Sequence, residues 1–468
     1  MAEDAFDLVV IGAGPGGYVA AIRAAQLKLK TAIIEREHLG GICLNWGCIP
    51  TKALLKTAEI AHLMREAGQF GLKIADPQID WPAVVKRSRR VAAQLNAGVK
   101  TLLKKNGVTT IMGTARLTDR DQVVVADAAG SERRLKARHV ILATGARARS
   151  LPGIAADGKR IWTYKHALAP ERLPQSLIVV GSGAIGSEFA SFYADMGAKV
   201  TVVELLDRIL PQEDAEVSAF VEKRFAKRGI TVRTGTTVKK ATAKGDGLAV
   251  TLAPAKGGQE ETITAERMIL AVGITGNSEG LGLEALGIQV ERGHVVVNEW
   301  AETHVPGIYA IGDLAGPPWL AHKASHEGII AVERIAGMKG VHPLRRERIP
   351  ACTFTRPQVA SLGLTEDKAK EQGIPVRIGR FPLIGNGKAI AIGEPEGFVK
   401  TVFDARTGAL LGAHMVGPEV TEMIQGFAIA MGLETTEAEL IDTVFPHPTV
   451  SEAMHESVLA AFDRVIHI

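Results

Sequence analysis

The sequence predicts an α/β fold in which two Rossmann-like domains are followed by an α+β domain. An apolar run ending in glycines, a helical pattern and a second apolar run follow one another at residues 6–35. The same order returns at residues 176–204, and short strands of a different texture begin near residue 349. A repeated strand, helix, strand order indicates two parallel sheets, and 468 residues suffice for about three domains.

The first domain is expected over residues 1–150. Its opening βαβ unit combines strands at 6–11 and 31–35 with a helix at 16–27. A later buried strand, 138–145, ends in a tight turn at Gly145, and Leu151-Pro152-Gly153 reads as the linker behind it.

The second domain is expected over residues 151–275. Strands at 176–180 and 199–204 enclose a helix at 181–196, and a strand at 268–273 that ends at Gly273 closes the unit. A central domain, 276–348, contains a strand at 307–313 whose end delivers Asp313. The last domain, 349–468, starts with antiparallel strands and ends in helices.

Composition excludes several classes of protein. The 55 basic and 51 acidic residues nearly balance, which gives no argument for a nucleic-acid partner. The basic run 86–90 lies in a helical stretch and is expected to be a solvated helix face. Three cysteines suit a reducing compartment, and no apolar run reaches the roughly 18 residues of a membrane span. We therefore expect a cytoplasmic protein that is not bound to membranes.

The glycine loop after the first strand matches a dinucleotide-binding fingerprint. Gly12, Gly14 and Gly17 have the G-x-G-x-x-G spacing, and Glu35 stands eighteen residues past the last of them. The glycines permit a tight turn, backbone approach to a pyrophosphate and close helix packing, while the acid accepts hydrogen bonds from ribose hydroxyls.

The second loop repeats this arrangement with Gly181, Gly183 and Gly186, again followed eighteen residues later by an acid, Glu204. A carboxylate at the ribose repels a 2′-phosphate, so we expect NAD(H) here instead of NADP(H). Arg208 lies close by in the sequence and keeps NADP(H) open as the alternative.

Two cysteines, Cys43 and Cys48, lie just downstream of the first loop. Their spacing suits a disulfide that opens and closes; a metal site more often has Cys-x2-Cys pairs or accompanying histidines, and two buried core cysteines are the other alternative. The helix-like run 51–56 places Cys48 near a helix N-terminus, which favours a thiolate. We predict no metal site. Cys352 is expected to be a small buried side chain.

The segment Phe445–Glu452 supplies a candidate acid–base pair. Most of the 13 histidines are expected to be structural. Pro448 is expected to start a helix, which would let Glu452 fold back on His447, fix its tautomer and stabilise its imidazolium form.

Taken together, these motifs resemble the FAD-dependent pyridine nucleotide–disulfide oxidoreductases over nearly the full chain, and most closely the members that oxidise protein-bound dihydrolipoyl groups with NAD+. The resemblance implies a homodimer, FAD and NAD as cofactors, and a lipoyl-bearing carrier domain of a 2-oxoacid dehydrogenase or glycine-cleavage complex as partner. Cys43 would be the thiol attacked by substrate, Cys48 the thiol against the flavin, and His447 a base supplied by the second subunit and oriented by Glu452.

The resemblance also assigns the cofactor sites by position. The expected FAD residues are Gly12, Gly14, Gly17, Glu35, Lys52, Gly145, Asp313 and Ala321, with Glu188 as the partner of Lys52 beside the flavin ring. The expected NAD residues are Gly181, Gly183, Gly186, Glu204 and Gly273.

Two departures from the family pattern stand out. Trp46 replaces a smaller aliphatic residue between the cysteines, and residues 273–277 replace the commoner Gly-Arg-Arg-Pro-Asn. The alternatives within the family are glutathione or trypanothione reductases and mercuric reductase. In the first two an Arg is expected at the position of Glu204, and in the third a pair of cysteines is expected at the C-terminus. A flavin-bearing redox sensor is the alternative from another class; it would not need the His447–Glu452 pair.

Overall fold

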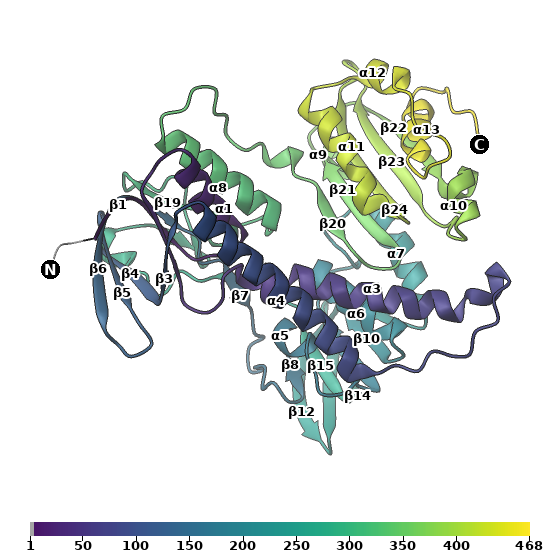
Figure 1. Ribbon diagram of the computed structural model, residues 1–468. Helices are drawn as coiled ribbons and strands as arrows, with labels where there is room; N and C mark the ends of the chain where they lie inside the picture. The colour runs from purple at the N-terminus through teal and green to yellow at the C-terminus, as the bar shows by residue number, and fades with distance from the viewer. Residues whose placement is uncertain (1–3) are drawn as a thin grey trace. The chain divides into compact units, whose positions relative to one another are not determined.

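A computed structural model describes residues 4–468 of the chain (Figure 1). The chain forms two compact units. The first contains the described residues up to 53 together with 83–149 and 273–345; the second contains 54–82, 150–272 and 346–468. The predicted α/β class is confirmed, because each of two parallel sheets contains a strand, helix, strand unit, β1-α1-β2 in the first and β9-α6-β10 in the second.

The first unit is built on a sheet of order β3-β2-β1-β6-β5-β4, with β19 beside the end of β6. Strands β3, β2, β1, β6 and β19 are parallel, whereas β4, β5 and the start of β6 are antiparallel. Leu8, Val9 and Val10 are fully buried, as expected of a parallel strand covered on both faces. The strands are β1 (Asp4–Ile11), β2 (Thr31–Glu35), β3 (Thr109–Met112), β4 (Thr114–Asp119), β5 (Gln122–Ala126), β6 (Glu132–Leu142) and β19 (Ile308–Ala310).

Helices α1 and α8 pack closely in this unit. A Cβ at Gly16 would meet the Ala324 carbonyl at 2.9 Å, and one at Gly328 would meet the Gly16 carbonyl at 2.8 Å, so glycine permits the contact. The helices are α1 (Pro15–Gln26), α2 (Gly41–Trp46), α3 (Cys48–Arg65), which begins here, α4 (Trp81–Lys105), η2 (Glu284–Leu286), η3 (Gly312–Ala315) and α8 (Ala321–Ile335). The remaining strands form two pairs, β7 (Ala146–Ala148) with β16 (Ile274–Gly276) and β17 (Val290–Glu291) with β18 (His294–Val295).

The second unit contains a parallel sheet of order β11-β10-β9-β15-β8 and a three-stranded antiparallel sheet of order β12-β13-β14. The strands are β8 (Ile161–Trp162), β9 (Ser176–Val180), β10 (Lys199–Val203), β11 (Thr231–Arg233), β12 (Thr236–Lys244), β13 (Gly247–Pro254), β14 (Glu261–Ala265) and β15 (Arg267–Leu270). The helices are η1 (Ala67–Phe70), α5 (Tyr164–Ala167), α6 (Ala184–Asp195) and α7 (Ala215–Lys227).

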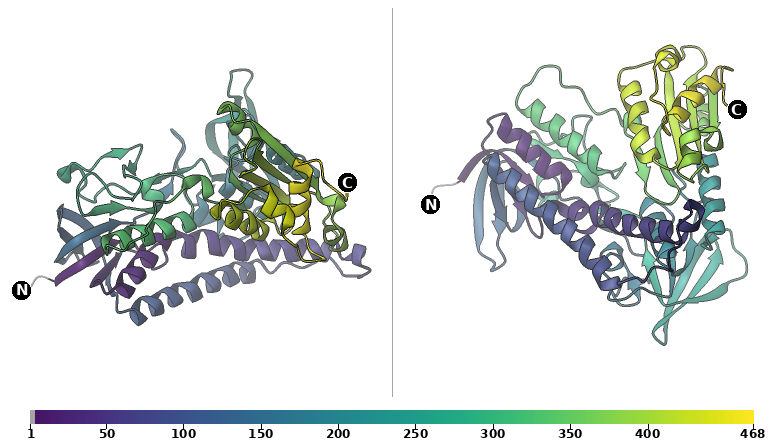
Figure 2. Two further views of the ribbon diagram at one scale, coloured as in Figure 1. Left: turned by 90° about the horizontal axis from the view of Figure 1, so that it is seen from above. Right: turned by 45° about the vertical axis from the view of Figure 1, so that its right-hand side comes forward.

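The C-terminal part of the second unit is an antiparallel sheet of order β20-β21-β24-β23-β22, against which α11 and α13 pack (Figures 1 and 2). Its strands are β20 (Ala351–Thr353), β21 (Gln358–Gly363), β22 (Val376–Pro382), β23 (Phe398–Asp404) and β24 (Leu410–Gly417). The helices are η4 (Arg346–Arg348), α9 (Glu366–Glu371), η5 (Leu383–Gly385), α10 (Gly387–Ala391), α11 (Val420–Gly432), α12 (Glu437–Asp442) and α13 (Glu452–Ala461).

The predicted helix start at Pro448 is wrong. Helix α13 begins at Glu452, and the His447–Pro448 peptide bond is cis. The preferred φ of proline suits the first turn of a helix, but here the Thr449 N–H donates to the Glu452 side chain at 2.9 Å and the helix begins only at Glu452.

Candidate functional site

The first glycine loop leaves an open cradle at the start of α1. Gly12 has a φ of +104°, and a Cβ there would meet the Ala143 carbonyl at 2.3 Å; a Cβ at Gly17 would meet the Gly12 carbonyl at 1.9 Å. A Cβ at Gly14 would instead meet nothing within 4 Å. Gly14 is also the N-cap of α1 and offers the helix no side-chain cap. The first-turn N–H groups therefore suit a pyrophosphate.

Glu35 closes this cradle from the end of β2. One carboxylate oxygen accepts from the Ala13 N–H at 2.9 Å, and the other accepts from the Glu37 N–H at 2.8 Å. These bonds fix the carboxylate beside the loop and leave further lone pairs for ribose hydroxyls. The loop and the acid thus fit the dinucleotide half of FAD.

Asp313 lies in η3, directly after β19, where burial raises the pKa of its carboxyl group and Lys323 opposes the shift. Sequence reasoning did not single out Lys323 and Glu327, which hold this turn. The Lys323 ammonium donates to the carbonyls of Gly312 at 3.1 Å and Gly316 at 2.8 Å, and Glu327 accepts from the Gly312 N–H at 2.8 Å. The sequence shows only that a lysine and a glutamate have i, i+4 spacing; in the structure the two side chains form an ion pair at 3.2 Å.

The other expected flavin residues of the first unit lie at turns and helix starts. Gly145 has a φ of +67° between β6 and β7, and its carbonyl accepts from the Asn277 N–H at 2.9 Å. Ala321 is the first residue of α8. Gly273, expected at the NAD site, falls in this unit; it has a φ of +101°, and its carbonyl accepts from the Arg149 N–H at 3.0 Å.

The second glycine loop is built in the same way. A Cβ at Gly181 would meet the Ala271 carbonyl at 2.3 Å, and one at Gly186 would meet the Gly181 carbonyl at 1.9 Å. Gly183, the N-cap of α6, has open space where its Cβ would be. The cradle at α6 therefore has the same shape requirements as the cradle at α1.

Glu204 is buried at the end of β10, with 7% of its surface exposed. Its carboxylate accepts from the Ser182 N–H at 2.8 Å, the Ser182 hydroxyl at 2.7 Å and the Leu206 N–H at 2.9 Å. Arg208 donates instead to the Pro211 carbonyl at 3.5 Å. The fixed charge beside this loop is thus an anion, which suits an unphosphorylated ribose.

Glu188 and Lys52 belong to different compact units. Glu188 lies on α6 with 6% of its surface exposed and accepts from the Phe354 N–H at 2.9 Å. Lys52 lies in the first turns of α3, and its charge acts on Cys43 by lowering the pKa of that thiol.

Cys43 and Cys48 meet at the junction of α2 and α3. The hydrogen bond that the Cys43 thiol makes to the Cys48 side chain, followed by burial, raises the pKa of Cys43 well above its ordinary value; the Cys48 N–H and Lys52 act in the opposite direction. Both residues are thiols, with Cys48 exposed and Cys43 half-buried. The prediction that Cys48 lies at a helix N-terminus is confirmed, because α3 begins there. Two thiols in such contact resist double ionisation, so one thiolate forms first.

Residues 40–48, which carry both cysteines and are called the thiol hairpin below, pack against the first glycine loop. The Gly40 N–H donates to the Ala13 carbonyl at 2.8 Å, and a Cβ at Gly41 would meet the Gly14 Cα at 2.7 Å. The segment that carries Cys43 therefore rests on the loop suited to a pyrophosphate. Cys352 is separate from it; its sulfur lies 3.7 Å from the Thr421 carbonyl beside the C-terminal core.

His447 and Glu452 form a pair ahead of α13. His447 Nδ1 lies 2.9 Å from Glu452 Oε1, and the Thr449 N–H donates to Glu452 Oε2 at 2.9 Å. Burial alone would raise the pKa of Glu452, but the Thr449 N–H and His447 outweigh it and hold the pKa below its ordinary value. The predicted contact is present, and 79% of the His447 side chain is exposed in the single chain.

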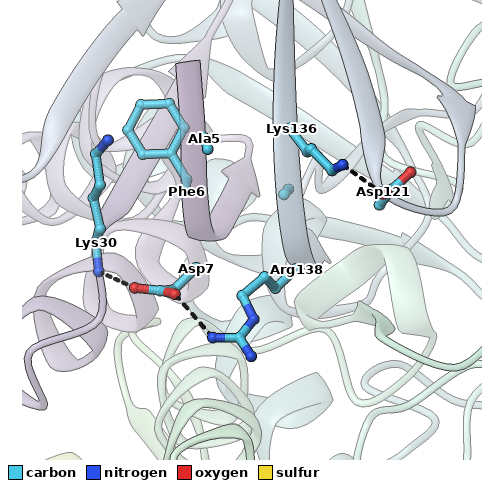
Figure 3. A pocket seen from close by; sticks show the side chains of 8 residues that line it. Ala5, Phe6, Asp7, Lys30, Asp121, Lys136 and Arg138 are labelled. Atoms are coloured by element: carbon cyan, nitrogen blue, oxygen red, sulfur yellow. Dashed lines mark hydrogen bonds and ion pairs between the residues drawn. The ribbon is translucent and has the colours of Figure 1, made fainter. Parts of the chain in front are cut away.

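A pocket of about 260 Å³ lies away from these loops, near the amino end of β1 (Figure 3). Four of its charged side chains pair with one another, Asp7 with Arg138 at 3.5 Å and Lys136 with Asp121 at 3.9 Å, and the Lys30 ammonium lies over the Phe6 ring. The predicted site residues do not line it. Within residues 4–468, no cluster of three or more His, Cys, Asp and Glu side chains could hold a metal ion, and no helix is long and apolar enough to cross a membrane.

Two family models match the chain. The model described as pyridine nucleotide-disulphide oxidoreductase matches residues 6–328, and that of the family's dimerisation domain matches residues 349–458. The chain therefore belongs to the pyridine nucleotide-disulphide oxidoreductases, a family that binds a flavin and a pyridine nucleotide. The resemblance predicted from the sequence is confirmed.

The individual relatives agree with one another. The dihydrolipoyl dehydrogenase of Zymomonas mobilis is 58% identical over 467 residues, covering 99% of each chain. That of Rhizobium etli is 56% identical over 482 residues, with both chains covered completely. The crystal structure of LpdA from Mycobacterium tuberculosis has a TM-score of 0.90 at 32% identity, and the match covers 97% of this chain and 99% of that one.

Proposed function

We propose that the protein oxidises dihydrolipoyl groups to lipoyl groups with NAD+, through a redox-active Cys43–Cys48 pair and FAD. The observation that carries this proposal is the contact of the two thiols on a hairpin attached to the first dinucleotide cradle. The identity to dihydrolipoyl dehydrogenases, up to 58% over almost the whole chain, supports the choice of substrate.

We assign the cofactor residues from the two glycine loops and from the family pattern. The proposed FAD site contains Gly12, Gly14, Gly17, Glu35, Lys52, Gly145, Asp313 and Ala321, and Glu188 is a further residue proposed for the flavin. The proposed NAD site contains Gly181, Gly183, Gly186, Glu204 and Gly273. FAD, when bound, supplies the two-electron chemistry that links the thiol pair to the nicotinamide. In this division residues 1–150 bind FAD, 151–275 bind NAD, 276–348 complete the FAD site and 349–468 form the subunit interface.

His447 starts the thiol chemistry by taking a proton from one substrate thiol, because the thiolate is the nucleophile. Glu452, held ionised by the Thr449 N–H, fixes the imidazole through Nδ1 and stabilises its protonated form.

The thiolate attacks the Cys43 sulfur of the Cys43–Cys48 disulfide, and the bond to Cys48 breaks with Cys48 leaving as a thiolate. The second substrate sulfur, after losing its proton, attacks the first and releases Cys43. The substrate loses two electrons and two protons and gains a disulfide, while the protein disulfide gains the two electrons. The Cys48 N–H and Lys52 favour the thiolate form of Cys43 released here.

The match to the dimerisation domain supports a homodimer. We propose that His447 acts on the thiol pair of the other subunit, and that the substrate arrives on a lipoyl-bearing carrier domain of a 2-oxoacid dehydrogenase or glycine-cleavage complex.

A steady-state assay tests the function. The purified holoprotein should form NADH from NAD+ and dihydrolipoamide, and should use NAD+ better than NADP+ because of the buried Glu204 carboxylate. Cys43→Ser should keep FAD and lose this activity, with Cys352→Ser as the matched control that retains it. Activity with glutathione disulfide and NADPH in place of dihydrolipoamide and NAD+ would contradict the proposal.

The two cysteine roles are separable by absorption. Cys43→Ser should show a long-wavelength charge-transfer band from the Cys48 thiolate without added reductant, whereas Cys48→Ser should keep FAD and lack the band. The reverse pattern would exchange the roles of the two thiols.

A further inference from the structure

Arg89 and Trp46 form a stacked pair beside the thiol hairpin. The Arg89 guanidinium carbon lies 4.1 Å from the centre of the Trp46 ring, and the same guanidinium donates to the Asn45 carbonyl. Trp46 is the last residue of α2, three positions after Cys43, and Arg89 comes from α4. The expectation that the basic run 86–90 is a solvated face is therefore wrong for Arg89, which is half-buried.

A second arginine of the same run, Arg87, contacts α3, the other helix that carries a cysteine. Arg87 Nη1 donates to the Ala53 carbonyl of α3 at 2.8 Å. Further along α4, the Asn96 amide donates to the Leu39 carbonyl at 2.7 Å and to the Asn45 side-chain oxygen at 3.2 Å. We call Arg87, Arg89 and Asn96 the α4 clamp, because these three side chains fasten both helices that carry the cysteines.

The α4 clamp contacts residues 39–47, a segment that also has hydrogen bonds and close contacts of its own. The Asn45 amide donates to the carbonyls of Leu39 at 2.9 Å and Gly41 at 2.8 Å. A Cβ at Gly47 would lie 3.3 Å from the Cys43 Cα, so α2 ends directly against the residue that carries the thiol. A shift of the last turn of α2 would therefore move Cys43 relative to Cys48.

Two opposing effects act on the Arg89 cation: burial disfavours its charge, whereas the end of α2 and the Trp46 ring favour it. Burial lowers the pKa of Arg89, and its Nη1 atom is buried without a hydrogen-bond partner among the described residues. The cation lies at the C-terminal end of α2, where carbonyl groups point outward and favour positive charge. Stacking on an indole is worth more once the guanidinium is partly removed from water.

We infer that Arg89 and Trp46 are positioning residues that hold the two sulfurs in contact and so favour the Cys43–Cys48 disulfide. This inference rests on the proposed function, in which the pair opens and closes. Disulfide formation within one chain depends on how often the two sulfurs meet in the right geometry. Loosening α2 should therefore make the disulfide easier to reduce without removing any reacting atom.

The test measures the equilibrium between the dithiol and the disulfide. Holoprotein is equilibrated anaerobically in mixtures of oxidised and reduced dithiothreitol, quenched, alkylated, and scored for labelled Cys43 and Cys48 by peptide mass. Arg89→Met and Trp46→Leu should each lower the equilibrium constant for disulfide formation measurably, by up to about tenfold, the limit set by the whole worth of one partly desolvated cation–π contact. A tenfold change corresponds to about 30 mV in the reduction potential.

Conservative and control variants separate positioning from general damage. Trp46→Phe keeps an aromatic face and should stay near the wild-type value, while Arg89→Lys keeps the charge without the planar fork and should fall between wild type and Arg89→Met. Combining Arg89→Met with Trp46→Leu should add little to either alone, because both remove the same contact. Arg90→Met, at the next and exposed position of α4, should change nothing.

The outcomes distinguish this inference from the function on which it rests. A wild-type protein that never forms the Cys43–Cys48 disulfide would overturn the proposed function. A wild-type disulfide whose equilibrium is the same in Arg89→Met, Trp46→Leu and Arg90→Met, each with full FAD content, would overturn the inference alone. If Arg89→Met fails to fold, Arg89→Lys and Trp46→Leu still decide the question.

Discussion

Alanine substitutions at Gly14 and Gly183 should separate the two cofactors. Both residues have extended backbone, with φ and ψ of −67° and −177° at Gly14 and −64° and −177° at Gly183. Alanine adopts these angles without strain, and its Cβ would meet no protein atom within 4 Å at either position. The added methyl group enters the space that the pyrophosphate needs, so we expect the fold to survive and one cofactor to be lost in each variant.

The size of the effect follows from the bonds that the methyl group displaces. A hydrogen bond to a charged group contributes about 1.5–3 kcal/mol. Losing one N–H to phosphate bond should therefore weaken binding roughly 10- to 150-fold. Folding itself should change by less than about 1 kcal/mol, with a slight gain expected because alanine restricts the unfolded chain.

Three measurements on each variant check this prediction. Gly14→Ala should lose FAD on gel filtration, and with it all activity. Gly183→Ala should keep FAD and still be reduced by dihydrolipoamide, but the KM for NAD+ should rise by the factor above. FAD loss in Gly183→Ala, or full FAD retention with unchanged activity in Gly14→Ala, would refute the assignment of the loops. Gly17→Ala serves as the contrasting control, because its Cβ would lie 1.9 Å from the Gly12 carbonyl and should destabilise the fold itself.

Three further predictions follow from the same structure. His447→Ala should lower dihydrolipoamide oxidation about 10²- to 10⁴-fold, the usual effect of a positioned base, while NADH reduction of a non-thiol dye survives; equal losses in both assays would indicate misfolding. A heterodimer of Cys43→Ser and His447→Ala chains should recover about half of the wild-type activity if each site takes its thiols and its histidine from different subunits, and background activity from FAD-loaded heterodimers would contradict this. The hydrogen bond from Lys370 lowers the pKa of Glu366 from 4.5 to about 2, so this carboxylate stabilises the fold above pH 4.5 and that contribution is lost as the pH falls towards 2; acid should lower the unfolding temperature less in Glu366→Gln than in wild type.

The loops and strands of both nucleotide units could be predicted because their signals are local. The strand at residues 31–35 has the predicted bounds, and the glycines at 12 and 17 occupy positions where a side chain would meet backbone. Such requirements appear directly in the sequence as residue types at fixed spacing. The thiol contact was equally readable, because four residues separate Cys43 from Cys48 at a helix start.

Contacts between distant segments were not readable in the same way. Arg89 looked like one charge of a solvated run, and only the packing of α4 brings it onto Trp46. Lys323 and Glu327 carry no motif in the sequence, yet they hold the turn that carries Asp313. A long basic side chain has the same pattern in the sequence whether it faces water or a carbonyl group from another helix.

The most direct test of the proposed reaction is to find which cysteine sulfurs dihydrolipoamide reduces. Oxidised holoprotein is mixed anaerobically with one equivalent of dihydrolipoamide in the absence of NAD+, alkylated once this half-reaction is complete, and digested for peptide mass analysis. We expect Cys43 to become labelled only after the addition. Cys48, which lies against the flavin in the proposed holoprotein, should be labelled as well when the protein is denatured before alkylation, while labelling of Cys352 should be the same with and without substrate. Unchanged labelling of Cys43 and Cys48 in a protein that still turns over dihydrolipoamide would contradict the proposed reaction.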